Sequence, residues 1–192
     1  MSVGQILEIA GVIFTLLNVY LLTRQKILAW PFGLLGVSIY AYIFYSAQLY
    51  SDFILHLIYI VLNAYGWWYW ASGHYEKEDD LQVTSLFPKE KVIWIVTIVL
   101  GFLLWGYLMQ RHTDAALPYP DAFTTVTSLV AQYLLARKKI ENWILWIIVD
   151  IVAIIIYVIK DLYPTSILFA ILLILSISGF LTWKKSIEKP DN

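Results

Sequence analysis

The sequence predicts an all-α integral membrane protein with seven transmembrane helices, arranged as two parallel three-helix repeats joined by a linker helix. Three observations predict this fold class: seven apolar runs long enough to cross a bilayer, a gapless internal repeat, and an uneven distribution of basic residues between the loops. The composition agrees, because the 192 residues are 60% hydrophobic and 14% charged, whereas a soluble domain carries about 25% charged residues.

The apolar runs, each of roughly 17–20 residues, predict helices that span the membrane. The predicted spans are 6–22, 28–45, 53–70, 91–109, 121–136, 142–159 and 164–183. The fifth run is the least hydrophobic, because it contains Thr124, Thr125, Thr127 and Ser128. We therefore divide the chain into a first repeat (1–70), a middle region (71–120) and a second repeat with a tail (121–192). The middle region contains a hydrophilic linker at 74–90, the connecting helix and an external loop at 110–120.

The internal repeat has an offset of 113 residues and needs no gap. Between residues 20 and 70 the two copies share 16 identities in 51 aligned positions. The shared positions include Arg, Trp and Gly, which a merely apolar composition does not explain: Arg24 aligns with Arg137, Trp30 with Trp143, and Gly66 with Gly179. The repeat also supports the weak fifth span, because it aligns with the clear first one. Parallel repeats of this kind are typical of transporters, with the substrate held near the middle of the membrane.

The basic residues predict the orientation of the spans. With seven spans, one side of the membrane receives all the basic residues except Arg111 and Lys160. The positive-inside rule makes that side cytoplasmic, which places the N-terminus outside and the C-terminus inside. The linker at 74–90 is then cytoplasmic, and its mixed charges indicate a solvated segment without a specific site. The first residues lack the pattern of a cleaved signal, so we expect the first span to be retained.

The composition also excludes several functions. The net charge of −1 offers no basis for binding nucleic acid. The chain has no cysteine, hence no thiolate nucleophile and no cysteine metal site. Its three histidines, His56, His74 and His112, do not cluster in the sequence. Because no nucleophile and base have a useful spacing, we expect neither an enzyme nor a cofactor.

Polar side chains at membrane depth are costly and usually face the interior of a bundle or a substrate path. In the sixth span Asn142, Trp146 and Asp150 follow one another at i, i+4 and i+8, on one helix face. Asp150 lies about 12–14 Å along that helix, near the middle of the membrane. Its carboxyl group either clasps a neighbouring helix or faces the substrate, and we favour the second role.

The fifth span carries a second polar stripe. Its members are Asp121, Thr124, Thr125, Ser128 and Gln132. The hydroxyl groups could equally be packing contacts that bond to their own helix, and Asp121 could be a helix cap. In the third span Asn63 precedes Trp67 by one turn, as Asn142 precedes Trp146, so that either indole could stack on a flat cationic ring or serve in ordinary packing.

Four other tryptophans, which the repeat aligns in two pairs, are predicted to form an aromatic belt at the cytoplasmic interface. They are Trp30, Trp70, Trp143 and Trp183. The polar residues, unlike these tryptophans, are not duplicated. Asn142, Trp146 and Asp150 align with Ala29, Gly33 and Val37, Gln132 aligns with Val19, and Asn63 and Trp67 align with Ser176 and Phe180. Since the scaffold is repeated and these groups are not, the sequence favours an asymmetric small-molecule ligand.

The chain resembles the Pnu family of bacterial vitamin transporters over nearly its whole length. The resemblance lies in residues 30–52, in NAYGWWYW at 63–70, in 120–150 and in 157–163. It implies a SWEET-like arrangement of three helices, a linker helix and three helices, a homotrimer in the inner membrane, and facilitated diffusion of substrate. It also implies that Asn142 and Trp146 contact the substrate.

The resemblance favours nicotinamide riboside as the substrate, with thiamine as the alternative within the family. In this interpretation Trp146, with Trp67, stacks on the ring of the substrate, and Asp150 balances its positive charge. The hydrogen-bonding partners are Asn142, Gln132, Asn63, Ser128 and Thr124. Proton-coupled transport through Asp150 and a non-transporting scaffold remain alternatives. A scaffold would tolerate the loss of Asp150.

Overall fold

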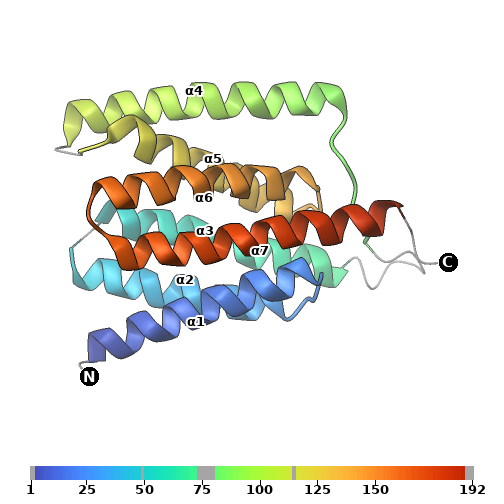
Figure 1. Ribbon diagram of the computed structural model, residues 1–192, viewed down its shortest axis with the longest axis horizontal. Coiled ribbons are helices and arrows are strands. Elements are labelled where there is room, and N and C mark those ends of the chain that lie inside the picture. The colour runs from blue at the N-terminus through green and yellow to red at the C-terminus, as the bar shows by residue number, and fades with distance from the viewer. Residues whose placement is uncertain (1–2, 49, 73–80, 114–115, 189–192) are drawn as a thin grey trace. The chain divides into compact units, whose positions relative to one another are not determined.

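The computed structural model describes residues 3–48, 50–72, 81–113 and 116–188, which form seven α-helices (Figure 1). The helices are α1 (Val3–Thr23), α2 (Ala29–Ser46), α3 (Tyr50–Ser72), α4 (Pro88–His112), α5 (Pro118–Ala136), α6 (Glu141–Ile159) and α7 (Tyr163–Glu188). The predicted all-α architecture is confirmed. By length and composition alone, four of the helices are apolar enough to cross a membrane, namely α1, α4, α6 and α7.

Several helices extend beyond the predicted boundaries, and two of these extensions begin at a proline. The expected external loop at 110–120 is shorter, because α4 continues to His112 and α5 begins at Pro118. Proline is favoured in the first turn of a helix, where its missing N–H would have no helical partner. Pro88 begins α4 in the same way. Both prolines were interpreted as loop residues, and in both cases they start a helix.

The chain forms two compact units, Met1–Gln82 and Val83–Asn192. In the first unit α2 packs against both α1 and α3. In the second unit α5 packs against α4 and α6, and α6 packs against α7. The connecting helix α4 thus packs with the second repeat, where its Gly101 faces Val126 and its Gly106 faces Tyr119.

The internal repeat is confirmed in the backbone of the two units. Among the described residues the non-glycine positions with positive φ form two pairs 113 residues apart: Gln25 (54°) with Lys138 (49°), and Gln48 (59°) with Asp161 (56°). This conformation costs a non-glycine residue about 1–2 kcal/mol. Because each strained turn recurs at the repeat offset, the two copies have kept the same helix-ending geometry.

The four tryptophans of the predicted aromatic belt are all buried, so that prediction is wrong. Trp30 meets Trp70 edge to face at 5.3 Å, and Trp143 meets Trp183 in the same way at 5.4 Å. Each pair lies beside a glycine that leaves room for an indole ring, Gly66 beside Trp30 and Gly179 beside Trp143. The tryptophans lie near the ends of their predicted spans, which is why the sequence suggested an interfacial position. Because glycine has no side chain, the rings have room to pack inside the protein.

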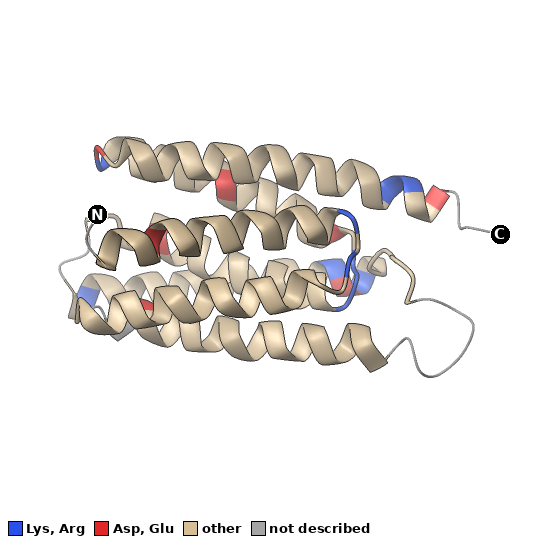
Figure 2. Ribbon diagram, turned by 90° about the horizontal axis from the view of Figure 1, so that it is seen from below, with Lys and Arg blue, Asp and Glu red and all other residues tan. Residues whose placement is uncertain are grey.

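The described Lys and Arg residues lie at helix ends or in turns (Figure 2). Lys77 and Lys189, which the orientation argument also used, lie outside the described residues. Asp121, in the first turn of α5, does not cap its helix, because the cap position is Leu117. Its carboxylate instead accepts hydrogen bonds from Lys160 Nζ at 3.0 and 3.1 Å, which joins the start of α5 to the end of α6.

The hydrophilic linker is only partly described, since residues 74–80 lie outside the described ranges. The prediction that the linker is a solvated segment is wrong for Val83 and Leu86. Val83 and Leu86 are buried, and Thr84 forms a backbone bridge with Lys139 in the turn between α5 and α6. Apolar residues within this charged segment hold it against the second unit.

Candidate functional site

The residues selected from sequence lie on three helices of the two units. Asn142, Trp146 and Asp150 are on α6 of the second unit, and Thr124, Ser128 and Gln132 are on α5 of the same unit. Asn63 and Trp67 are on α3 of the first unit.

Asn142 is completely buried at the start of α6. Its Nδ2 donates a hydrogen bond to the Lys139 carbonyl oxygen at 2.6 Å. Its Oδ1 is also buried and has no hydrogen-bond partner among the described residues. Leaving a buried acceptor unpaired costs about 1–3 kcal/mol. The side chain thus presents one acceptor that a ligand with an N–H or O–H group could satisfy.

Asp150 contacts α7 through a buried hydrogen bond. Ser176 Oγ donates to Asp150 Oδ2 at 2.9 Å, and both side chains are almost fully buried. Among the described Asp and Glu residues, Asp150 is the one at the middle of a helix. The interhelical clasp considered from sequence therefore forms. Sequence reasoning considered Ser176 only as the counterpart of Asn63. The signal that could have revealed this contact is that Asp150 and Ser176 lie at similar depth on adjacent spans.

Replacing Ser176 by alanine is expected to destabilise the protein by about 1–3 kcal/mol, because one buried carboxyl oxygen loses its donor. Asp150→Asn keeps an acceptor for the Ser176 hydroxyl and should be milder. Thermal unfolding of the purified variants measures both changes. Ser178→Ala is the matched control, since Ser178 is two residues away on α7 and is exposed. Equal stability of the two serine variants would show that the clasp contributes nothing.

Two of the hydroxyl groups of α5 bond to their own helix. Thr124 Oγ1 donates to the Asp121 carbonyl oxygen and Ser128 Oγ donates to the Thr125 carbonyl oxygen, each at 2.9 Å. Such bonds satisfy the donor and leave the oxygen as an acceptor. Gln132 is buried one turn beyond Ser128.

Thr127 is a residue that sequence reasoning missed as a candidate. Its side chain is buried, and its Oγ1 has no hydrogen-bond partner among the described residues. In the sequence it stood out only as one of several hydroxyl residues that lower the hydropathy of the span. Burial of a hydroxyl without a partner is a property of the packed helices, and no sequence pattern reports it.

Asn63 is the polar centre of the first unit. Its Nδ2 donates to the Tyr59 carbonyl oxygen at 2.8 Å, and its buried Oδ1 has no partner among the described residues. A Cβ atom added to Gly33 would collide with Asn63 Oδ1 and lie 2.7 Å from Asn18 Nδ2. The glycine at the position that matches Trp146 thus leaves room for two amide side chains. Sequence reasoning missed Asn18, and Trp67 is 41% exposed.

Within the described ranges, no three His, Asp or Glu side chains come together in a group that could hold a metal ion. The polar centres found instead are uncharged amides and hydroxyls, together with the Asp150 carboxyl group. Groups of this kind suit the hydrogen-bonded recognition of a small polar molecule.

Residues 5–185 match the family described as "Nicotinamide mononucleotide transporter". The chain belongs to this family. The transporter is 27% identical to the nicotinamide riboside transporter PnuC of Escherichia coli (strain K12), an alignment that covers 94% of this chain and 85% of that protein. It is 28% identical to the PnuC protein of Neisseria mucosa, over 91% of this chain and 70% of that one.

Two further comparisons concern fold and substrate. A crystal structure of the vitamin B3 transporter PnuC superposes with a TM-score of 0.77 and 26% identity, covering 95% of this transporter and 82% of that chain. The riboflavin/roseoflavin transporter RibM of Streptomyces davaonensis is 27% identical, over 77% of this transporter and 70% of that protein. The protein is therefore a multi-pass vitamin transporter of the inner membrane and not an enzyme, and the predicted Pnu resemblance is confirmed.

Proposed function

We propose that this transporter imports nicotinamide riboside by facilitated diffusion. The observation that carries the proposal is the buried, unpaired Oδ1 of Asn142 in a chain that aligns with PnuC proteins over nearly its whole length. The carboxamide of nicotinamide riboside has N–H groups that could donate to this oxygen. Ala29, at the matching position of the first repeat, has no such acceptor.

The other residues on α5 and α6 have complementary roles in this proposal. Trp146 stacks on the cationic pyridinium ring, for which a cation–π contact contributes about 0.5–2 kcal/mol. Asp150, held by Ser176, balances the positive charge of the ring. The hydroxyl groups of the ribose bond to the polar side chains of α5, which are Gln132, Ser128 and Thr124. Asn63 and Trp67 lie in the first unit, and their part in substrate binding stays a prediction from the sequence.

The proposal includes the assembly and orientation inferred from sequence: a homotrimer with the N-terminus outside and the C-terminus in the cytoplasm. The positive-inside rule supports the orientation, and the family resemblance supports the trimer. Riboflavin is a second candidate substrate, because the relative RibM, a riboflavin/roseoflavin transporter, is similar over 77% of this chain. Thiamine, the alternative substrate that the family resemblance implies, is the third candidate.

Calorimetric titration of the purified, detergent-solubilised protein with nicotinamide riboside, riboflavin and thiamine in parallel tests the proposal. We expect saturable binding of nicotinamide riboside and no saturable heat from the other two. Saturable binding of riboflavin or thiamine alone would reassign the substrate. A folded protein that binds none of the three would contradict the proposal.

A further inference from the structure

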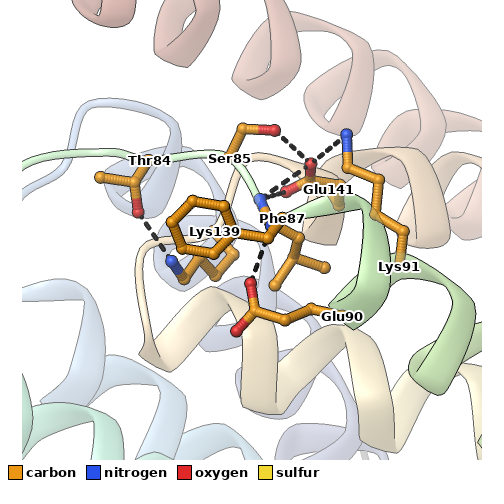
Figure 3. A network of polar contacts seen from close by, with 8 residues as sticks. Thr84, Ser85, Phe87, Glu90, Lys91, Lys139 and Glu141 are labelled. Carbon is orange, nitrogen blue, oxygen red and sulfur yellow. Dashed lines mark hydrogen bonds and ion pairs between the residues drawn. The ribbon is translucent and has the colours of Figure 1, made fainter.

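The segment 83–87 is attached to the turn between α5 and α6, and we call it the strap (Figure 3). Thr84 N donates to the Lys138 carbonyl oxygen, and Ile140 N donates to the Thr84 carbonyl oxygen, both at 3.0 Å. Lys139 Nζ adds a bond to Thr84 Oγ1 at 3.0 Å. The strap therefore contacts three consecutive residues of the turn that leads into α6.

Glu141, the first residue of α6, binds the strap with its carboxylate (Figure 3). Ser85 Oγ donates to Glu141 Oε1 at 2.6 Å, and Leu86 N lies 3.1 Å from both carboxylate oxygens. Lys91 Nζ on α4 lies 3.0 Å from Oε1. The Glu141 side chain is only 14% exposed. Hydrogen bonds to a charged group of this kind are about twice as strong as those between neutral groups.

Leu86 anchors the strap in the core of the second unit. Its side chain is buried in one apolar cluster with Ile98 of α4 and with Val130 and Leu134 of α5. The strap is thus held by apolar contacts on one side and by Glu141 on the other. A segment held in both ways can limit the movement of the turn that it contacts.

The turn in contact with the strap orients Asn142. The Lys139 carbonyl oxygen accepts hydrogen bonds from Asn142 N at 3.1 Å and from Asn142 Nδ2 at 2.6 Å. Because Nδ2 is held by the turn, the direction of the unpaired Oδ1 depends on where the turn lies. The strap, the turn and the Asn142 carboxamide form one connected series of hydrogen bonds.

The first repeat shows that the turn forms without a glutamate at this position. Lys26 N donates to the Leu21 carbonyl oxygen at 3.0 Å, as Lys139 N donates to Leu134 at 2.9 Å. The counterpart of Glu141 is Leu28, which is 62% exposed. The counterpart of Asn142 is an alanine. The strap-binding glutamate therefore occurs in the repeat that has the asparagine, and forming the turn does not explain its presence.

We propose that Glu141 is a positioning residue, which holds the strap against the α5–α6 turn and thereby directs Asn142 Oδ1 toward the ligand. The inference rests on the proposed function to the extent that Asn142 binds the substrate. The strap carries no ligand contact of its own in this proposal. The strap acts indirectly, because it keeps the α5–α6 turn ordered and thereby raises the affinity for the ligand.

The test compares Glu141→Leu, Glu141→Gln and wild type by backbone hydrogen exchange and by calorimetric titration with nicotinamide riboside. Glu141→Leu reproduces the residue of the first repeat. We expect faster exchange at residues 84–87 and 138–143, and an affinity lower by about tenfold, because misplacing a contacting group weakens its interaction. Glu141→Gln keeps an acceptor for Ser85 and Leu86, so its exchange rates and its affinity should lie between those of wild type and Glu141→Leu. Glu188→Gln, which removes an exposed ion pair with Lys184 on α7, is the control and should match wild type.

The outcomes separate this inference from the proposed function. Unchanged exchange at residues 138–143 in both Glu141 variants would overturn the inference whether or not a ligand binds. Faster exchange with wild-type affinity would also overturn it. If wild type binds riboflavin or thiamine instead, the same affinity comparison is made with that ligand. If wild type binds none of the three, the proposed function fails, and unchanged or faster exchange at Asn142 still decides whether Glu141 orders the turn.

Discussion

Replacing Asn142 by alanine is expected to lower nicotinamide riboside uptake by at least about tenfold while the protein stays folded, because the ligand loses a buried hydrogen bond in a desolvated site. Stability should change by no more than about 1 kcal/mol, because the variant loses the bond to Lys139 and also removes an unpaired buried acceptor. The matching residue of the first repeat, Ala29, is fully buried, so the fold accepts alanine at this position. Uptake of radiolabelled nicotinamide riboside by cells, at matched expression, measures the effect.

Thr23→Ala is the matched control for this prediction. Thr23 Oγ1 donates to the Tyr20 carbonyl oxygen three residues before it, as Asn142 Nδ2 does to Lys139. Its counterpart in the second repeat is Ala136, which is also buried. Each variant therefore removes one local hydrogen bond and introduces the residue that the other repeat has at the matching position. Equal uptake by the two variants would show that Asn142 has only a local structural role.

Replacing Gly179 by alanine is expected to destabilise the second unit by about 1–3 kcal/mol through overpacking. The added Cβ would lie 2.6 Å from Trp143 Cζ2, and the Trp143 ring is fixed edge to face against Trp183. The higher helix propensity of alanine, about 1 kcal/mol, offsets only part of this cost. The midpoint of thermal unfolding in detergent measures the loss. A second substitution, Trp143→Leu, should restore part of it by making room for the methyl group.

Gly36→Ala provides the comparison, because its nearest neighbour, Thr15 Oγ1, would lie 3.3 Å from the new Cβ. We expect a much smaller shift for this variant. Gly66→Ala should behave like Gly179→Ala, since Trp30 occupies the matching place in the first repeat. If Gly179→Ala and Gly36→Ala unfolded at the same temperature, the close indole contact would not contribute to stability.

The helices and the repeat could be predicted from the sequence because both depend on local or periodic features. A run of apolar residues predicts a membrane helix wherever it packs, and the offset of 113 residues was visible without any structure. The turn residues Gln25 and Lys138 share a backbone conformation because each copy begins its second helix in the same way. Asn142 could be singled out because its helix face and its missing counterpart can both be read from the chain, and the structure shows that its side chain is buried. Its contact with substrate stays a prediction.

The partners of these residues depended on distances between helices, which no periodicity encodes. The sequence placed Trp143 at the interface by depth, but the space beside Gly179 lets the ring pack inside. The sequence predicts how deep Asp150 lies in the membrane. That Ser176 is its hydrogen-bond donor depends on the packing of α6 against α7. The charged linker was expected to be solvated, yet Leu86 and Glu141 attach it to the second unit. Local sequence thus specified the elements and their polar residues, whereas burial and hydrogen-bond partners followed from packing between segments distant in the chain.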